Sequence, residues 1–297
     1  MTLPTGQVVA GGGYETPTDP SRVATGIAIG VNSDARTGSI DIGGRAYIGT
    51  MGGKQISNKN AGGHVNQTTL GTNSYNKGLF STMVGSYSIT TGGFDGSGYS
   101  NSSRYAAQNF GATVIGSLNS VRSNENRWSG TSYQGIANTI VGLGNITDNT
   151  NGSLVFGAGN TITNSITDIY MPTSGANSVD AMVDKLQSTI KSSNSGGATL
   201  AIGGGNSANY TRTSSIIGVN NTMTGTSSNI SQYNALTGYN NTGTNVTNVT
   251  VTGSNNTVSG STSIVNLGNE NAVEDSNNTI LLGDNRTVTG SDNSTYP

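Results

Sequence analysis

The sequence predicts an all-β chain that folds as a parallel β-solenoid, a stack of short coils of about 14–15 residues each. Two observations predict it: a repeated Gly-x-x-Asn or Gly-x-x-Ser element, and a composition suited to many tight turns. Gly supplies 45 of the 297 residues and charged residues only 9%, against roughly a quarter in ordinary globular chains. The net charge of −2 and the 5 Pro are unlike those of a disordered chain. A repetitive sheet with many turns has this composition.

The repeat is plainest in the last third of the chain, where the key glycines from Gly238 to Gly283 recur with a period of 15. Twelve glycines fit the frame: Gly30, Gly71, Gly85, Gly116, Gly142, Gly157, Gly203, Gly218, Gly238, Gly253, Gly268 and Gly283. The longer gaps, from Gly85 to Gly116 and from Gly157 to Gly203, are close to two and three periods. Each coil is therefore expected to be one repeat unit that stacks on the next.

A turn is expected from each Gly to the residue three positions later, which is Asn or Ser in eleven of twelve copies, with Arg286 the exception. Gly and Asn both tolerate positive φ, so the element predicts a turn that can be stacked. The Asn side chain can bond nearby backbone or its copy in the next coil. The main structural turn residues are Asn160, Asn206, Asn221, Asn241, Asn256 and Asn271.

The two residues before each Gly are apolar in ten of twelve copies each, for example Ile216 and Ile217 before Gly218. Successive side chains of a strand point to opposite faces, so such a strand is expected to be buried on both faces. A third apolar position, five residues after the Gly, is placed in a second strand inside the coil. A coil of this size has only a thin interior, so the other face needs a second chain, and the sequence predicts an obligate oligomer.

Several units resemble the head repeats of YadA-like trimeric autotransporter adhesins, among them Gly26-Ile-Ala-Ile-Gly30, Ala198-Thr-Leu-Ala-Ile-Gly203 and Ser215-Ile-Ile-Gly218. The family repeat reads approximately Ser-x-Ala-Ile-Gly-x-x-Ala/Ser. The resemblance covers roughly residues 23–290, although the period here is more often 15 than 14 and Asn replaces the small turn residue. It implies a left-handed parallel β-roll, with three chains packed side by side about one axis.

The resemblance also implies a function, that of an adhesin head exposed on a bacterial outer membrane, with a part in virulence. The expected partners are two further copies of the chain in a homotrimer, and a host cell-surface protein, such as an immunoglobulin-like adhesion receptor, or an extracellular-matrix protein. We expect an N-terminal segment at 1–22, the head at 23–290, and a C-terminal extension at 291–297 that leads toward a neck and stalk. The membrane would be reached only through a C-terminal anchor outside this sequence.

Four segments interrupt the repeat, near 50–66, 90–110, 122–135 and 163–197. Insertions in repeat proteins emerge as loops that often carry function, and Trp, Tyr and Arg dominate binding hot spots. The candidate ligand-binding residues are Arg127, Trp128, Tyr133, Phe94, Tyr99, Tyr105 and Tyr170. The alternative is that these aromatic side chains pack under their own loops or between chains.

A helix is predicted in the last of these insertions, from an apolar stripe at Val179, Met182, Val183, Leu186 and Ile190. Asp180 suits its first turn and Lys191 its last. The helix is expected to lie across the roll or to bundle with its symmetry mates, and the alternative is that it docks a ligand directly.

The sequence offers little for catalysis. It has no Cys and one His, and its acidic residues cluster only at Glu270, Glu274 and Asp275, so we predict no enzyme activity, no cofactor and no metal site. Nucleic acid is not expected as a partner, because phosphate binding needs clustered Lys and Arg.

Two other functions stay open. An ice-binding solenoid would use a Thr column, and Thr follows the turn Asn at Thr161, Thr222, Thr242 and Thr257. That column is incomplete, and the insertions are expected to spoil a flat face. A carbohydrate-active solenoid would need a pair of carboxylates.

Overall fold

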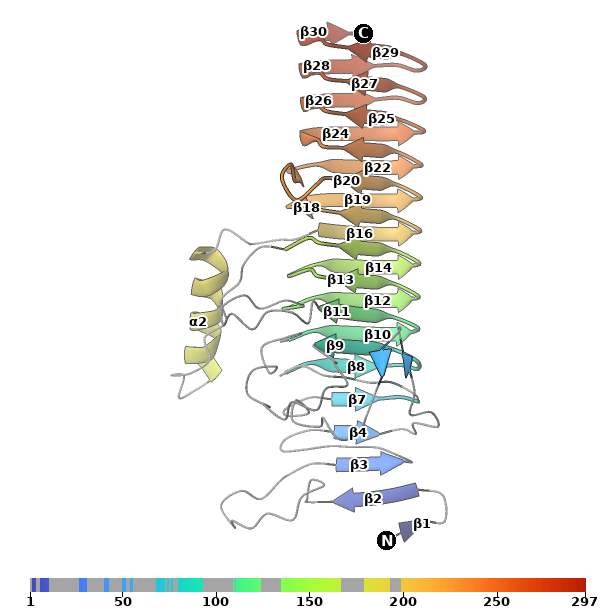
Figure 1. Cartoon of the computed structure of the whole chain (residues 1–297), viewed down its shortest axis with the longest axis vertical. Coiled ribbons are helices and arrows are strands. Elements are labelled where there is room, and N and C mark those ends of the chain that lie inside the picture. The colour runs from blue at the N-terminus through green and yellow to red at the C-terminus, as the bar shows by residue number, and fades with distance from the viewer. Residues whose placement is uncertain are drawn as a thin grey trace.

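The computed structural model describes residues 2–3, 6–10, 27–30, 40–42, 50–51, 54–55, 68–72, 74, 76, 80–92, 109, 111–123, 135–166, 179–192 and 199–297. Within these residues the chain forms a stack of coils, with β1 and β2 at one end and β30 at the other (Figure 1). The predicted all-β class and the parallel stacking of coils are confirmed.

One sheet, which we call the long sheet, runs the length of the stack. Its strands are β1 (Thr2–Leu3), β2 (Gly6–Ala10), β3 (Ile27–Gly30), β4 (Ile40–Ile42), β7 (Thr68–Leu70), β8 (Thr82–Val84), β10 (Thr113–Ser117), β12 (Thr139–Leu143), β14 (Leu154–Ala158), β16 (Thr199–Gly204), β18 (Thr211–Arg212), β19 (Ser214–Val219), β21 (Ser231–Gln232), β22 (Ala235–Tyr239), β24 (Thr247–Ser254), β26 (Thr262–Leu267), β28 (Asn277–Leu282) and β30 (Asp292–Tyr296). All its pairings are parallel except β1 with β2 and β2 with β3.

The second sheet, which we call the short sheet, is parallel throughout. Its strands are β9 (Ile89–Gly92), β11 (Ser120–Ser123), β13 (Ile146–Asp148), β15 (Thr161–Thr163), β17 (Ser207–Asn209), β20 (Thr222–Thr224), β23 (Thr242–Thr244), β25 (Thr257–Ser259), β27 (Ala272–Glu274) and β29 (Thr287–Thr289). Outside the two sheets, the described residues form a small antiparallel pair, β5 (Thr50–Met51) with β6 (Lys54–Gln55), and one helix, α2 (Val179–Ser192). From β10 to β30 each coil contributes to both sheets, and in two coils the long-sheet part is divided into two consecutive strands, β18 with β19 and β21 with β22.

The long gaps in the repeat are single steps of the stack. β8 pairs directly with β10, and β14 with β16, so no hidden coils fill these gaps, and their closeness to multiples of the period is a coincidence. The glycine repeat also leaves out one rung of the stack, by which we mean the long-sheet strand of one coil. β4 pairs with both β3 and β7, and the Gly43 that follows it escapes the frame because Asp41 interrupts the apolar pair. At the other end, β30 pairs with β28 and carries the long sheet past residue 290, to Tyr296.

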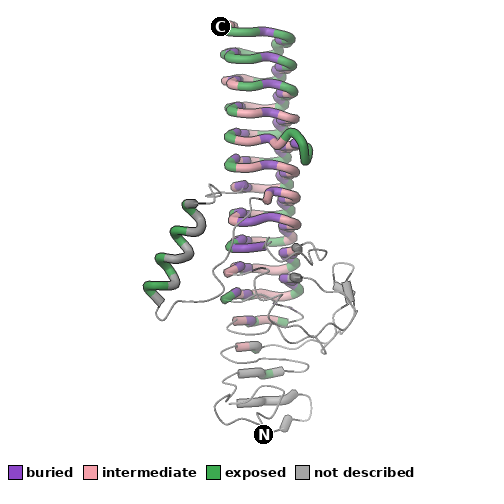
Figure 2. The backbone as a smooth tube through the Cα atoms, turned by 60° about the vertical axis from the view of Figure 1, so that its left-hand side comes forward, coloured by how far each residue is buried: buried purple, intermediate pink, exposed green. Residues whose placement is uncertain are grey.

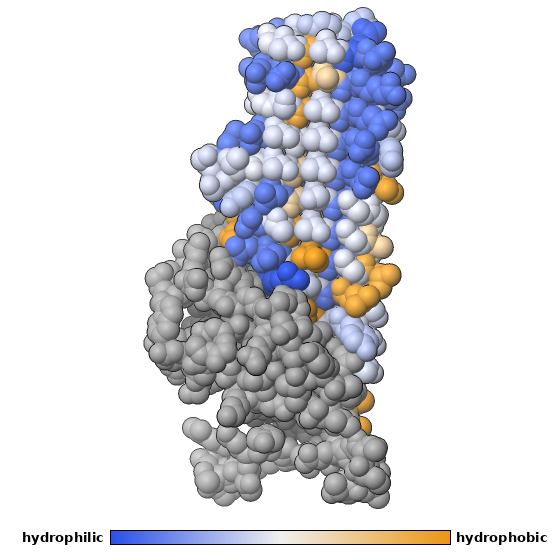
Figure 3. Space-filling view, turned by 45° about the vertical axis from the view of Figure 1, so that its right-hand side comes forward, coloured by the Kyte–Doolittle hydropathy of each residue, from blue (hydrophilic) through white to orange (hydrophobic). Residues whose placement is uncertain are grey.

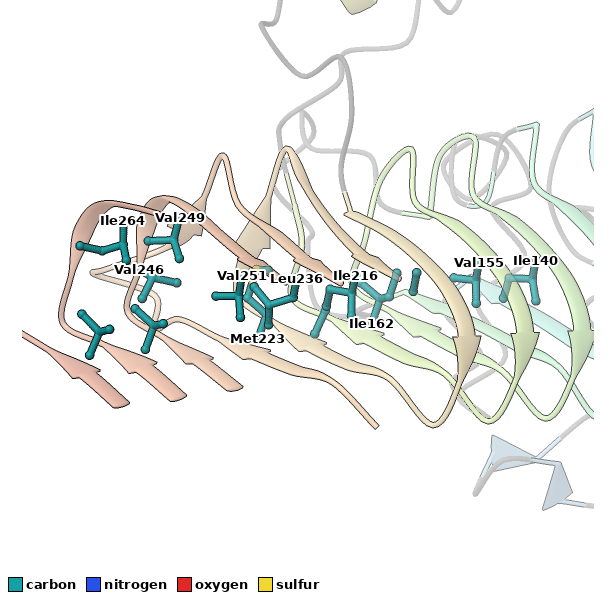
Figure 4. Packing of buried hydrophobic residues seen from close by; sticks show 14 of the residues in the cluster. Ile140, Val155, Ile162, Ile216, Met223, Leu236, Val246, Val249, Val251 and Ile264 are labelled. Atoms are coloured by element: carbon teal, nitrogen blue, oxygen red, sulfur yellow. The ribbon is translucent and has the colours of Figure 1, made fainter. Parts of the chain in front are cut away.

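The interior of the stack is one apolar column (Figure 4). From Gly71 onward, the residue two positions before the Gly is buried in the long sheet, and the residue five positions after it is buried inside the coil, as predicted. The buried long-sheet residues are Met83, Val114, Ile140, Val155, Ala201, Ile216, Leu236, Val251 and Leu281, and the short-sheet residues are Val121, Ile162, Ala208, Met223, Val258, Val273 and Val288. Their contacts across the thin coil hold the two sheets together.

The residue directly before each Gly lies on the outer face of the long sheet. There it forms a second apolar column, which we call the outer column, whose side chains remain 37–44% exposed in the single chain: Ile29, Ile42, Leu70, Val84, Ile115, Phe156, Ile202, Ile217, Leu267 and Leu282. At the same position Val141 is less exposed, and Thr237 and Thr252 are polar. Figure 2 shows the resulting alternation of buried and less buried residues along each coil. One coil therefore shelters only one of its two apolar positions.

The turn after each long-sheet strand depends on its Gly. Gly238 has φ near +123°, and a Cβ there would overlap the carbonyl oxygen of Gly253. The expectation that the buried Asn also takes positive φ is wrong. In the coil of Asn241 the positive φ belongs to Asn240, one residue earlier. Asn241 itself is fully buried and turns its amide toward the neighbouring coils.

Candidate functional site

Three of the four predicted insertions leave the stack at the same edge. The chain departs after β9, β11 and β15 and returns at β10, β12 and β16, so each insertion replaces the turn from a short-sheet strand to the next long-sheet strand. We call this line of turns the insertion edge. It lies opposite the Gly-x-x-Asn turns, and in Figure 1 it is the left side of the stack.

The attachment points of these insertions are close together. β9 pairs with β11, β11 with β13, and β13 with β15. Paired strands are about 4.8 Å apart, so the three insertions begin within about 15 Å of one another along the edge. Their residues can therefore contribute to one surface.

The insertion after β11 is added to an otherwise complete coil. Asn119 and Asn145 are separated by 26 positions, and removal of the segment 124–134 leaves the usual separation of 15. The flanking residues keep the register of the uninserted coil that follows, because the Gly135 N–H donates to the Thr150 carbonyl (2.9 Å) and the Gly152 N–H to the Ile136 carbonyl (2.7 Å). The insertion is thus 124–134, narrower than the predicted 122–135, since Arg122 and Gly135 belong to the coil.

The insertion that contains α2 is held at both ends by one residue of the next coil. Ser165 lies before this insertion and Thr199 after it, and the Thr211 hydroxyl hydrogen-bonds with both of their hydroxyls. All three side chains are buried. The repeat frame misses Thr211, whose signal is a Thr where the equivalent position of other coils holds Ser or Val.

The candidate ligand-binding residues all belong to these insertions. Arg127, Trp128, Tyr133, Phe94, Tyr99, Tyr105 and Tyr170 lie outside the described residues. The structure gives the points where their segments join the stack: Phe94, Tyr99 and Tyr105 between β9 and β10, the Trp128 group between β11 and β12, and Tyr170 between β15 and β16.

The predicted helix is present as α2, with Asp180 in its first turn and Lys191 in its last. It lies beside the stack in Figures 1 and 2. Val183, one member of the predicted apolar stripe, is exposed. The side chains of the other stripe members, Val179, Met182, Leu186 and Ile190, are outside the described part of the structure.

The outer face of the short sheet carries two parallel ranks of hydroxyl side chains. The first rank contains Thr161, Ser207, Thr222, Thr242, Thr257 and Thr287, and the second contains Thr163, Thr224, Thr244, Ser259 and Thr289. The first rank is interrupted by Ala272, and the second by Asn209 and Glu274. The insertions join the stack between strands, and the short-sheet strands on either side of each insertion pair directly with one another.

The sequence cluster of acids is spread across a coil. Glu270 lies in the turn before β27, and Asp275 follows β27 on the insertion edge, each with positive φ. Glu270 and Asp275 therefore lie at opposite ends of β27, and Glu274 is its last residue. Among the described residues, no group of three His, Cys, Asp or Glu is placed to hold a metal ion, and no helix is long and apolar enough to cross a membrane.

Comparison of the chain with protein-family models, with curated proteins and with solved structures gives no match.

Proposed function

We propose that this chain is the head of a trimeric bacterial surface adhesin of the YadA-like kind, a left-handed β-roll that presents its insertion edge to a host receptor or to extracellular matrix. The observation that carries the proposal is that two different features occupy separate sides of the coil. One edge gathers three long insertions within about 15 Å, while the outer face of the long sheet presents an apolar column.

The outer column supports the assembly of several copies. It runs from Ile29 in β3 to Leu282 in β28, which at about 4.8 Å per rung is about 60 Å. Exposed apolar surface of this extent marks an interaction site. A second copy of the chain has the same rise per rung, so its apolar rungs meet those of the first along the whole length. Three copies about one axis cover all three columns.

The insertion edge supports the role in adhesion. A rigid stack holds its insertions at constant spacing, and the segment 124–134 brings Arg127, Trp128 and Tyr133 together in sequence. These residue types supply most of the binding energy in protein interfaces. A trimer presents three copies of each insertion, so weak single contacts add up to strong attachment.

Deletion of residues 124–134 tests the proposal, because it restores a coil of the ordinary length and leaves the scaffold complete. Wild type and the deletion are compared for binding to arrayed extracellular-matrix proteins and immunoglobulin-like receptors, and to host cells. The matched control deletes residues 226–230, the short exposed segment on the same edge that lengthens the separation of Asn221 and Asn241 from the usual 15 positions to 20. Loss of binding only in the first deletion supports the proposal. Wild type that binds no protein or cell in these assays contradicts it.

A second candidate function is ice binding, favoured by the two hydroxyl ranks of the short sheet. β20, β23 and β25 are adjacent and carry Thr or Ser at all six outer positions. Parallel strands space these hydroxyls regularly along and across the face. Thermal hysteresis of the purified chain decides this candidate. Hysteresis that is lost in Thr224→Tyr with Thr244→Tyr supports ice binding, and a freezing point equal to the melting point removes it.

A further inference from the structure

Within the outer column, between β3 and β28, the rung formed by β24 differs from the rest. β24 presents Thr250, Thr252 and Ser254 on the outside of the long sheet, all at least partly exposed. The rungs on either side are more apolar, with Tyr239 beside Thr237 in β22 and with Val265 and Leu267 in β26. The outer column is therefore broken by a wholly polar rung.

The polarity of β24 is confined to its outer face. Val249 and Val251 point into the coil and are fully buried, so the strand alternates strictly between polar outside and apolar inside. In β28 the corresponding outer residues are Ile280 and Leu282. Inside the coil, β24 therefore packs like the other long-sheet strands. Its polar residues affect only contacts made with the outer face.

A surface of identical rungs leaves the axial register between two copies weakly specified. If every outer rung were equally apolar, two copies displaced by one coil, about 4.8 Å, would still bring apolar rungs together. A displaced arrangement would lose only the contacts of one rung at the end. Periodic surfaces of this kind specify their register weakly.

A polar rung removes the equivalence. In an assembly in register, β24 of one copy meets β24 of the others, and Thr and Ser hydroxyls can both donate and accept hydrogen bonds among themselves. A displacement by one coil toward the C-terminus places Thr252 against Leu267, which leaves its hydroxyl without a partner in the interface. Single polar positions fix register in the same way in coiled coils.

We propose that Thr250, Thr252 and Ser254 form a polar layer between copies of this chain and set the axial register of the assembly. The inference rests on the proposed trimer, which is measured separately by its mass. It identifies residues that determine how the copies align, whereas the apolar rungs supply the affinity.

The experiment replaces Thr250 and Thr252 with Val, which keeps the shape of each side chain and removes the hydroxyl. The chain has no Cys, so Thr289→Cys, on the exposed outer face of the short sheet, carries the spin label for pulsed electron-spin distance measurements between copies. The background with both Thr present should give one inter-label distance. The double Val variant should assemble equally well but give additional distances from displaced copies.

Two controls accompany the double variant. Thr250→Ser with Thr252→Ser keeps both hydroxyls and should retain the single distance. Thr242→Val with Thr257→Val removes two hydroxyls from the short sheet and should also retain it. One unchanged distance in the Thr250 and Thr252 double Val variant, or several distances in the background, overturns the polar layer. A monomeric background overturns the assembly itself, which its mass distinguishes from either of these results.

Discussion

The side-chain amide of Asn241 donates a 2.8 Å hydrogen bond to the carbonyl oxygen of Gly253 in the next coil. Its own oxygen accepts from the backbone N–H and the side-chain amide of Asn256. The bond to the Gly carbonyl and the bond from the backbone N–H of the next Asn recur from coil to coil, so the buried Asn side chains join the Gly-x-x-Asn turns into a continuous ladder. Figure 3 shows the molecule rotated so that the side with the Gly-x-x-Asn turns comes forward. In this view, surface residues of similar hydropathy form columns along the stack.

Asn241→Ala should lower the free energy of unfolding by about 2–4 kcal/mol, because it removes the hydrogen-bond partners of the Gly253 carbonyl and of the Asn256 backbone N–H. Asn241→Ser should cost less. Ser74 and Ser88 already occupy this position in earlier coils, where their hydroxyls donate to the carbonyls of Gly85 and Gly116. Chemical denaturation of the three proteins measures the order. Equal stability of the Ala and Ser variants would contradict the role of the ladder.

Gly253→Ala should destabilise the stack far more than Gly290→Ala. A Cβ on Gly253 would overlap the carbonyl oxygen of Gly268, whereas nothing lies within 4 Å of a Cβ on Gly290. Both glycines have positive φ, so both substitutions carry the left-handed penalty of about 1–2 kcal/mol, and only the first adds a backbone clash. Similar melting temperatures for the two variants would show that the close approach of the turns is not essential.

Leu236→Ala and Ile217→Ser should separate the folding of one chain from the assembly of several. Leu236 is fully buried in the coil, and its truncation should lower the free energy of unfolding by about 2–5 kcal/mol. Ile217 lies on the outer column, so its substitution should weaken the association of copies and leave the circular dichroism spectrum unchanged. The checks are denaturation for the first variant and sedimentation velocity for the second.

Trp128→Ala should leave the melting temperature nearly unchanged and weaken binding to cells, because Trp128 belongs to an insertion that is added to a complete coil. The matched substitution Tyr233→Ala removes an aromatic side chain that is 59% exposed between β21 and β22, outside the predicted insertions, and should not affect binding. Collapse of the fold in Trp128→Ala would instead place this side chain in the packing of the molecule.

Repetition made most of the fold predictable from the sequence. Apolar residues recur in most coils at the positions of Ile216 and Ile217, and strand alternation alone places one of the two inside the coil and the other outside. Positions that depart from the apolar pattern were harder to predict. Asn266 occupies an interior position and stays there because its side-chain oxygen accepts from the amide of Asn271. Asp41 concealed the rung of β4, whose pairing depends on backbone rather than side chains.

The candidate site was predictable only in part. The insertions were visible as breaks in the repeat, but their common edge was not, because it depends on which of the two turns each insertion replaces. That information requires the register, for example the bond between Gly135 and Thr150. The second hydroxyl rank, with Thr224 and Thr244, lies two residues beyond the first, outside the Gly-x-x-Asn-Thr pattern that marks the first rank in the sequence.

The most direct test of the account is the molar mass of the purified chain in solution, measured by light scattering at micromolar concentration. The account predicts three times the chain mass of 30.1 kDa, because the outer column that includes Ile217 and Leu267 needs other copies to cover it. A stable monomer of 30.1 kDa that stays soluble with this column exposed would contradict it.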